Sequence, residues 1–151
     1  MIDDLKSQID NRKSTIANRK STIDMIYGIG VDIVNIGRME RVIEKWGDRF
    51  IRRVFTPAEM DLCLNRSSPV PAFSMRFAAK EAFSKAMGTG MKKGVRWRDI
   101  EVFHYPGGRP GLRLHGRSSE RCREENITGF HLSMSDDGGY GVAMVILEKG
   151  Q

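Results

Sequence analysis

Three side chains of this sequence have the types and spacing to handle a phosphate group: Asp32, Glu81 and Lys85. Asp32 closes an alternating apolar segment at residues 26–34, and Glu81 and Lys85 lie one helical turn apart within residues 75–87. Two carboxylates can hold Mg²⁺, which commonly takes one or two protein carboxylates together with phosphate oxygens. An ammonium group near that metal could neutralise a phosphate. These residues favour metal-assisted chemistry on a phosphate group.

Each of the three residues also has a simpler interpretation. Asp32 can cap or pair with a neighbour in the chain. Glu81 and Lys85 can form an exposed i, i+4 ion pair, which is worth about 0.3–0.5 kcal/mol. Since no rule of spacing brings the strand and the helix together, both interpretations stay open from these residues alone.

The elements that must position these side chains are a strand and a helix. Residues 26–34 alternate as in a strand, with Tyr27, Ile29, Val31 and Ile33 on one face and Gly28, Gly30 and Asp32 on the other. We expect the apolar face to form the core. The glycine face has no side chain before Asp32, so we expect it to leave open space for a ligand.

Residues 75–87 have an apolar, alanine-rich half and a polar half at helical spacing. Alanine allows a helix to pack closely on a sheet, and Gly88 and Gly90 are typical of the loop that ends a helix. A loop is predicted at 66–71. Further strands are predicted at residues 100–104, 112–115, 131–135 and 140–148, with a hairpin turn at 107–110 and a polar helix at 118–126.

A second helix is predicted after the first strand. Its apolar residues recur at helical spacing: Met39, Val42, Ile43, Trp46 and Phe50. Its other side carries Arg38, Arg41, Lys45 and Arg49, which can bind an acidic partner or only keep the helix solvated. Thr56, Pro57 and Glu59 predict a capping box at the start of the next helix.

Composition limits the classes of protein. The chain has 151 residues, 40% of them hydrophobic, and a net charge of +6, which fits one soluble domain that attracts anionic partners. No apolar run approaches the roughly 20 residues of a membrane span. Cys63 and Cys122 lack the spacing of a zinc site or a disulfide framework and are expected as buried thiols.

The first 24 residues differ from the rest, because NRKSTI occurs at residues 11–16 and again at 18–23. We expect residues 1–24 to be a flexible or non-native extension, with Met25 as a candidate start, and residues 25–151 to form the domain. Asp3, Asp4 and Lys6 leave no apolar segment for a secretory signal, so we expect a cytoplasmic protein.

Two strings resemble the signatures of the holo-acyl-carrier-protein synthases. The first runs from Gly28 to Ile33, with Arg38 six residues after Asp32, and is similar to GxGxDxxxxxR. The second is RFAAKEAFSKA at residues 76–86 with GTG at 88–90, and it resembles RFAxKEAxxKAxGTG. Shorter matches at 99–102, 108–110 and 131–133 extend the resemblance from about Met25 to Glu148.

The resemblance implies the 4′-phosphopantetheinyl transferase fold: a small single α+β domain, mostly antiparallel sheet packed by a long helix, acting as a homotrimer with active sites at subunit interfaces. It implies transfer of 4′-phosphopantetheine from coenzyme A to a serine of apo-acyl carrier protein in fatty acid biosynthesis, with release of adenosine 3′,5′-bisphosphate. Asp32 and Glu81 fall on the family's Mg²⁺ ligands, and Lys85 would hold the pyrophosphate.

The same resemblance assigns roles to further residues. Arg76, Lys80 and His131 are candidates for other phosphates of coenzyme A, and the loop at Gly88 would let its backbone approach the cofactor. The acidic carrier protein would bind Arg38, Met39, Arg41 and Lys45. Asp136 and Asp137 stand where many members have a histidine. The proton of the serine would go to Glu81 or to a metal-bound water.

Two other functions compete with this one. A basic protein can be a nucleic-acid-binding module, but no RRM, KH or zinc-finger signature is present. A degenerate, non-catalytic carrier-protein binder would not need Asp32, Glu81 and Lys85 together. We therefore expect an enzyme that uses neither nucleic acid nor a membrane.

Overall fold

The structure is a computed structural model that describes residues 1–8 and 25–150. The elements in chain order are β1 (Met25–Asn35), α2 (Ile36–Val54), α3 (Pro57–Leu64), α4 (Pro69–Ala86), the 3₁₀ turn η1 (Trp97–Asp99), β2 (Ile100–His104), β3 (Pro110–Leu114), α5 (Gly116–Glu124), β4 (Ile127–Asp137) and β5 (Tyr140–Lys149). Residues 2–8 form a further short helix. The NRKSTI repeats lie outside the described residues, and the extension at 1–24 stays a prediction.

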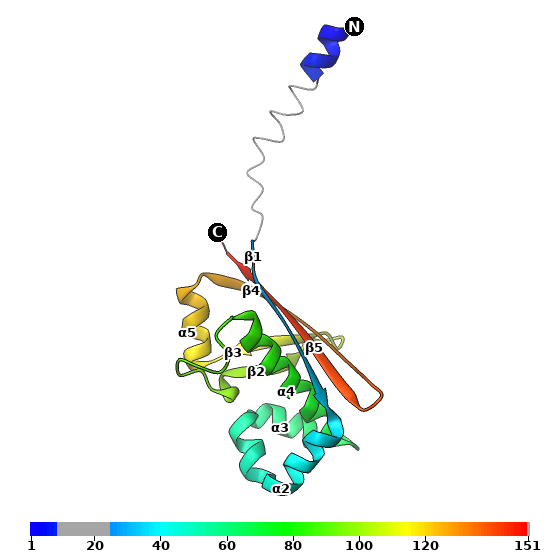
Figure 1. The fold of residues 1–151 in the computed structure, drawn as a ribbon, viewed down its shortest axis with the longest axis vertical. Coiled ribbons are helices and arrows are strands. Elements are labelled where there is room, and N and C mark those ends of the chain that lie inside the picture. Colours follow the sequence, from blue (N-terminus) through cyan, green and yellow to red (C-terminus); the bar gives the residue numbers. More distant parts are fainter. Residues whose placement is uncertain (9–24, 151) are drawn as a thin grey trace.

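The strands form two antiparallel sheets, one with the order β1-β5-β4 and one made of β2 and β3. Helix α4 lies along one face of the three-stranded sheet, with α2 and α3 at one end of the domain and α5 at the other (Figure 1). The turn between β2 and β3 is the predicted hairpin, in which Tyr105 N donates to Arg109 O at 2.8 Å. The predicted α+β single domain is confirmed.

The prediction for the two faces of β1 is wrong. Gly28 and Gly30 face α4, and a Cβ atom at these positions would lie 2.0 Å from Ala86 O and 1.9 Å from Ala82 O. The opposite, apolar face is exposed: Ile29 is 58%, Val31 56% and Ile33 65% accessible. A bulge between Ile26 and Gly28 turns Tyr27 to the core side. The glycines therefore leave room for a helix and not for a ligand.

Helix α4 contributes to both parts of the core. Its alanines and Phe83 pack with the inner residues of β5 and β2: Ala143, Val145, Leu147, Ile100 and Val102. Its N-terminal half packs with Ile51, Val54, Phe55 and Cys63 from α2, α3 and the turn between them. Cys63 and Cys122 are buried and free, as predicted. Because α4 touches nearly every other element, side chains on it are held in fixed positions.

Helix α2 is capped at its start and kinked at Gly47. Asn35 Oδ1 accepts from Arg38 N at 2.8 Å and caps its start. Gly47 has φ 50° and ψ −137°, a conformation that favours glycine and breaks the helix after Trp46. At the next helix Thr56 N donates to Glu59 Oε2 at 2.9 Å and Glu59 N donates to Thr56 Oγ1 at 3.3 Å, which confirms the predicted capping box.

Candidate active site

The close packing of α4 on β1 brings Asp32 and Glu81 together. Both line one cavity of about 450 Å³ between β1, α2 and α4, which we call the carboxylate cavity. Its other lining residues are Ile33, Val34, Asn35, Arg38, Met39, Val42, Phe50, Phe77 and Tyr140. The structure thus brings the strand and the helix together, which the spacing of residues in the sequence could not predict.

Lys85 reaches from α4 across to β1. Its Nζ lies 2.8 Å from Asp32 Oδ1 and 3.0 Å from Val31 O. The alternative Glu81–Lys85 ion pair is not formed within residues 25–150. Lys85 therefore links α4 to β1 instead of pairing within α4. The Lys85 side chain is half exposed, which leaves it accessible to an anion.

The surroundings of Glu81 raise the pKa of its carboxyl group. Burial raises the pKa of the Glu81 carboxyl, the nearby negative charge of Asp32 raises it further, and Lys85 partly opposes the shift. The carboxylate form of Glu81 is therefore less stable than in a free side chain. A cation between the two carboxylates would favour it again.

This arrangement predicts opposite shifts in two variants. Asp32→Asn removes one cause that raises the pKa of Glu81, so the pKa should fall. Lys85→Met removes the cause that lowers it, so the pKa should rise. Titration of the ¹³C-labelled Glu81 side-chain carboxyl by NMR, in protein free of metal and ligand, measures both. Equal titration curves in the two variants would contradict the proximity of the three groups.

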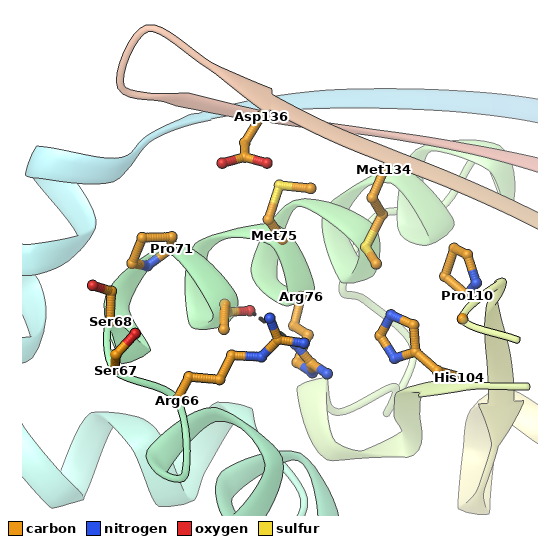
Figure 2. Close-up of a pocket in the computed structure, with 12 residues that line it drawn as sticks. Arg66, Ser67, Ser68, Pro71, Met75, Arg76, His104, Pro110, Met134 and Asp136 are labelled. Carbon is orange, nitrogen blue, oxygen red and sulfur yellow. Dashed lines mark hydrogen bonds between the residues drawn. The ribbon is translucent and has the colours of Figure 1, made fainter. Parts of the chain in front are cut away.

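A second cavity, the arginine pocket, lies between α4, the loop before it, the β2–β3 hairpin and β4. Its volume is about 490 Å³, and Arg66, Arg76, His104 and Asp136 line it (Figure 2). Figure 2 shows the guanidinium groups of Arg66 and Arg76 close to each other, with His104 facing them from the hairpin. Burial lowers the pKa of His104, and the charges of Arg76 and Arg66 lower it further.

Arg76 is only 3% exposed, and its Nη1 donates to Ala72 O at 3.2 Å. Its Nε is buried and has no hydrogen-bond partner among the described residues. The sequence identified Arg76 but missed Arg66 and His104, because only the topology brings the loop and the hairpin to α4. The two arginines give the pocket the positive charge that a phosphate requires.

The prediction that Lys80 holds a phosphate is wrong. Lys80 is 0% exposed, and its ammonium group donates to Glu59 Oε2 at 2.8 Å, to Trp97 O at 3.1 Å and to Ile100 O. These three bonds use all three of its protons. Lys80 and Glu81 are adjacent in the chain, but the helix turns one into the core and the other into the carboxylate cavity.

Two other predicted cofactor residues lie apart from both cavities. His131 is on the outer face of β4, away from α4, and its Nε2 lies 2.8 Å from Glu148 Oε2. Gly88 follows α4 with φ 72°, in the loop that leads to η1. Asp136 and Asp137 are the last two residues of β4. Asp136 lines the arginine pocket and Asp137 does not.

The predicted partner residues are divided between the cavity and the surface. Arg38 and Met39 line the carboxylate cavity, whereas Arg41 and Lys45 lie on the accessible side of α2. A third cavity, of about 740 Å³, adjoins the first and is called the tryptophan groove. It is lined by Val42, Trp46, Arg49, Phe50, Arg53, Val54, Phe77 and Trp97.

The tryptophan groove and the carboxylate cavity have three wall residues in common: Val42, Phe50 and Phe77. The two spaces are therefore neighbours that have one wall in common. Trp97 was not predicted as a lining residue, because it comes from η1, beyond the glycine loop. A largely apolar groove that includes Arg49 and Arg53 thus lies next to the cavity of the two carboxylates.

Comparison with known proteins agrees with this geometry. The model of the 4′-phosphopantetheinyl transferase superfamily matches residues 28–144. A holo-[acyl-carrier-protein] synthase of Geobacter sp. (strain M21) is 43% identical over 83% of this chain and 100% of its own.

Two solved structures agree as well. The crystal structure of holo-[acyl-carrier-protein] synthase from Neisseria meningitidis matches with a TM-score of 0.79 and 41% identity, over 83% of this chain and 100% of that one. The Helicobacter pylori holo-[acyl-carrier-protein] synthase in complex with coenzyme A matches with a TM-score of 0.69 and 34% identity, over 79% and 98%. The chain belongs to the 4′-phosphopantetheinyl transferase superfamily, within its family of holo-[acyl-carrier-protein] synthases.

Proposed function

We propose that this chain transfers 4′-phosphopantetheine from coenzyme A to a serine of apo-acyl carrier protein in fatty acid biosynthesis. The observation that carries the proposal is the meeting of Asp32 and Glu81 at one cavity between β1 and α4, with Lys85 bonded to Asp32. The relatives are named for this activity, and the Helicobacter pylori structure contains coenzyme A. The product is holo-acyl carrier protein, and adenosine 3′,5′-bisphosphate leaves.

Mg²⁺ fits the donor set of the carboxylate cavity. Within residues 1–8 and 25–150, no cluster of three or more His, Cys, Asp or Glu side chains could hold a metal ion. Asp32 and Glu81 supply the two carboxylates that Mg²⁺ commonly takes when substrate phosphates complete its shell. Both carboxylates line the same cavity, which supports a shared cation. When bound, Mg²⁺ would neutralise negative charge that develops on the pyrophosphate.

The protein's own groups would position the two substrates and neutralise the charge of the pyrophosphate. The serine oxygen of the carrier protein forms a bond to the phosphorus that bears pantetheine, and the bond from that phosphorus to the bridging oxygen breaks, so adenosine 3′,5′-bisphosphate leaves. Lys85, held by Asp32 and Val31 O, would face the pyrophosphate. The serine proton goes to Glu81 or to a water molecule. Glu81 lines the same cavity as Asp32, which supports a place for it near the reacting groups.

The arginine pocket supports binding of the remaining phosphate of coenzyme A. Arg66 and Arg76 line it and supply two guanidinium groups. The loop at Gly88 lies apart from both cavities, and since glycine has no side chain and no atom lies within 4 Å of the position of its Cβ, its backbone would be open to a part of the cofactor outside them. With Lys80 excluded by burial, Arg76 and Lys85 are the phosphate ligands that we retain from the sequence.

The outer face of the three-stranded sheet supports a homotrimer. In the register of the sheet, exposed Val31 of β1 lies beside Met144 of β5, and Met144 lies beside Ser133 of β4. Ile29 and Ile33 continue the apolar stripe on β1. Contiguous apolar side chains on the surface are typical of a protein interface. His131, on the same face, would then lie near a neighbouring subunit.

Val31→Asp should dissociate the trimer, because it places a charge in the middle of the apolar stripe. We expect sedimentation velocity to give a trimer for the wild type and a monomer for the variant, with much reduced transfer. Thr128→Asp, at the exposed edge of β4, is the matched control and should leave the assembly intact. A monomeric wild type would refute the proposed assembly.

An acidic carrier protein fits the positive side of α2. Arg38, Arg41 and Lys45 lie there, and the tryptophan groove below has arginines at its rim and an apolar interior. Charge would guide the approach, and an apolar side chain of the carrier protein would enter the groove. Arg38 also lines the carboxylate cavity, so it links the docked partner to the reacting groups.

Arg38→Ala should reduce transfer about 10-fold at low salt and weaken its dependence on ionic strength, since charged interface groups act largely on the association rate. The measurement is kcat/KM for the carrier protein at several salt concentrations. Arg123→Ala, an exposed arginine of α5, is the control and should behave as the wild type. Equal rates and equal salt dependence in all three proteins would remove α2 as the docking surface.

The direct test is mass spectrometry of an apo-acyl carrier protein incubated with this chain, coenzyme A and Mg²⁺. We expect the mass of one phosphopantetheine to be added, and none without coenzyme A or Mg²⁺. Binding to RNA that depends on salt alone, with no mass gain, would favour the nucleic-acid-binding alternative.

No helix of the described residues has both the length and the apolar character of a membrane span. A cytoplasmic location remains part of the proposal.

A further inference from the structure

The buried ion pair of Glu59 and Lys80 has no role in the chemistry described above. Both side chains are fully buried, and Lys80 Nζ lies 2.8 Å from Glu59 Oε2. Glu59 also accepts from Thr56 N and, through Oε1, from Val102 N at 2.9 Å. The pair therefore connects the start of α3, the middle of α4 and strand β2.

The other two protons of Lys80 reach the backbone that follows the glycine loop. They are donated to Trp97 O and Ile100 O, at the two ends of η1. Trp97 in turn stacks on Phe77 of α4, with ring centroids 4.9 Å apart and planes inclined by 22°. The backbone bond from Lys80 and the ring contact with Phe77 both fix Trp97 relative to α4.

Trp97 and Phe77 are walls of the tryptophan groove, and Phe77 is also a wall of the carboxylate cavity. Resting on the proposed function, we infer that Glu59 and Lys80 are a positioning pair that holds Trp97 and thereby shapes the groove for the carrier protein. Neither residue touches a substrate. Their effect passes through the backbone of η1.

The structure favours this role over a purely stabilising one. A buried ion pair contributes little net stability compared with apolar residues of the same shape, because both charges must lose their water. The capping box at Thr56 needs only Glu59 and does not need Lys80. What Lys80 adds is a set of directional bonds to carbonyl groups that no other described side chain contacts.

The inference predicts which substrate is affected. Asp32, Glu81, Lys85 and the arginine pocket make no hydrogen bond to η1. Loss of the pair should therefore raise KM for the carrier protein about 10-fold or more, since a small displacement of a remote group can have an effect of that size. KM for coenzyme A should stay within about two-fold of the wild type. Only the rise in KM for the carrier protein requires Trp97 to move.

The experiment uses the double variant Glu59→Gln/Lys80→Met, which removes both charges and leaves no unpaired one. It should retain much of the thermal stability, whereas Lys80→Met alone should lose more. Lys92→Met, in the exposed loop before η1, is the matched control. Steady-state kinetics gives both KM values. In a Trp46→Phe background, fluorescence reports Trp97 alone, and we expect a red shift and easier quenching by acrylamide in the double variant.

Trp97→Leu keeps the pair and removes the wall, so it covers the case in which the double variant does not fold. It should raise KM for the carrier protein and leave KM for coenzyme A unchanged. A stable double variant with wild-type fluorescence and wild-type KM would overturn the inference, and so would a Trp97→Leu variant with unchanged KM. If the wild type transfers nothing, the proposed function fails, while the fluorescence still tests whether the pair holds Trp97.

Discussion

Glu81→Gln and Asp32→Asn will each lower the rate of phosphopantetheine transfer by about 10²–10³-fold, the usual loss when one preorganised electrostatic group is removed from an active site. The two carboxylates line the same cavity, and each variant keeps the size of the side chain while removing its charge. Transfer followed by mass spectrometry at saturating coenzyme A measures the loss. Added Mg²⁺ should restore little of it.

Folding must be retained for this result to concern chemistry. Asp32 pairs with a half-exposed Lys85, and such pairs contribute about 0–1 kcal/mol, so thermal unfolding should change little. Asp48→Asn and Glu120→Gln, at exposed positions of α2 and α5, are the matched controls and should transfer at the wild-type rate. Full activity in either site variant would remove the carboxylate cavity as the active site.

Gly30→Ala will destabilise the protein by about 3 kcal/mol, at the upper end of the usual cost of overpacking. The added Cβ would lie 1.9 Å from Ala82 O and 2.6 Å from Ala86 N, both backbone atoms of α4 that cannot move aside alone. The helix and the strand must separate, which also moves Glu81 away from Asp32. Urea unfolding measures the stability, and the mass-spectrometric assay should show a parallel loss of transfer.

Gly37→Ala is the control for this prediction. Gly37 lies in the first turn of α2, and the nearest atom to an added Cβ is Asn35 Oδ1 at 3.4 Å. Alanine is a better helix former than glycine by about 1 kcal/mol, so this variant should be as stable as the wild type or more so. If Gly30→Ala unfolds at the same urea concentration as Gly37→Ala, the packing of α4 on β1 is looser than described.

The sequence predicted elements whose signals are local. The capping box at Thr56 and Glu59 and the turn between β2 and β3 depend on neighbouring residues only, and both are present. The start of α4 was missed, because Pro69 and Pro71 suggested a loop. The first turn of a helix tolerates proline, since its N–H groups need no partner within the helix.

Long-range features were harder to predict. The alternation in β1 gave two faces but not which one is inside, and the apolar face proved to be exposed. The glycine face lies inside because α4 packs directly against the strand backbone there. A side chain on that face would prevent so close an approach. The same limit applies to the site. Spacing could not bring Asp32 to Glu81, and only the resemblance to a known family did so.

The wall shared by the carboxylate cavity and the tryptophan groove limits how the protein can be redesigned. Val42, Phe50 and Phe77 line both spaces, so on the proposed function a change there would alter carrier-protein binding and the carboxylate cavity at once. Trp46 and Trp97 face only the groove. Engineering towards a different carrier should therefore begin at these two tryptophans, where a library of substitutions can vary recognition while turnover is preserved.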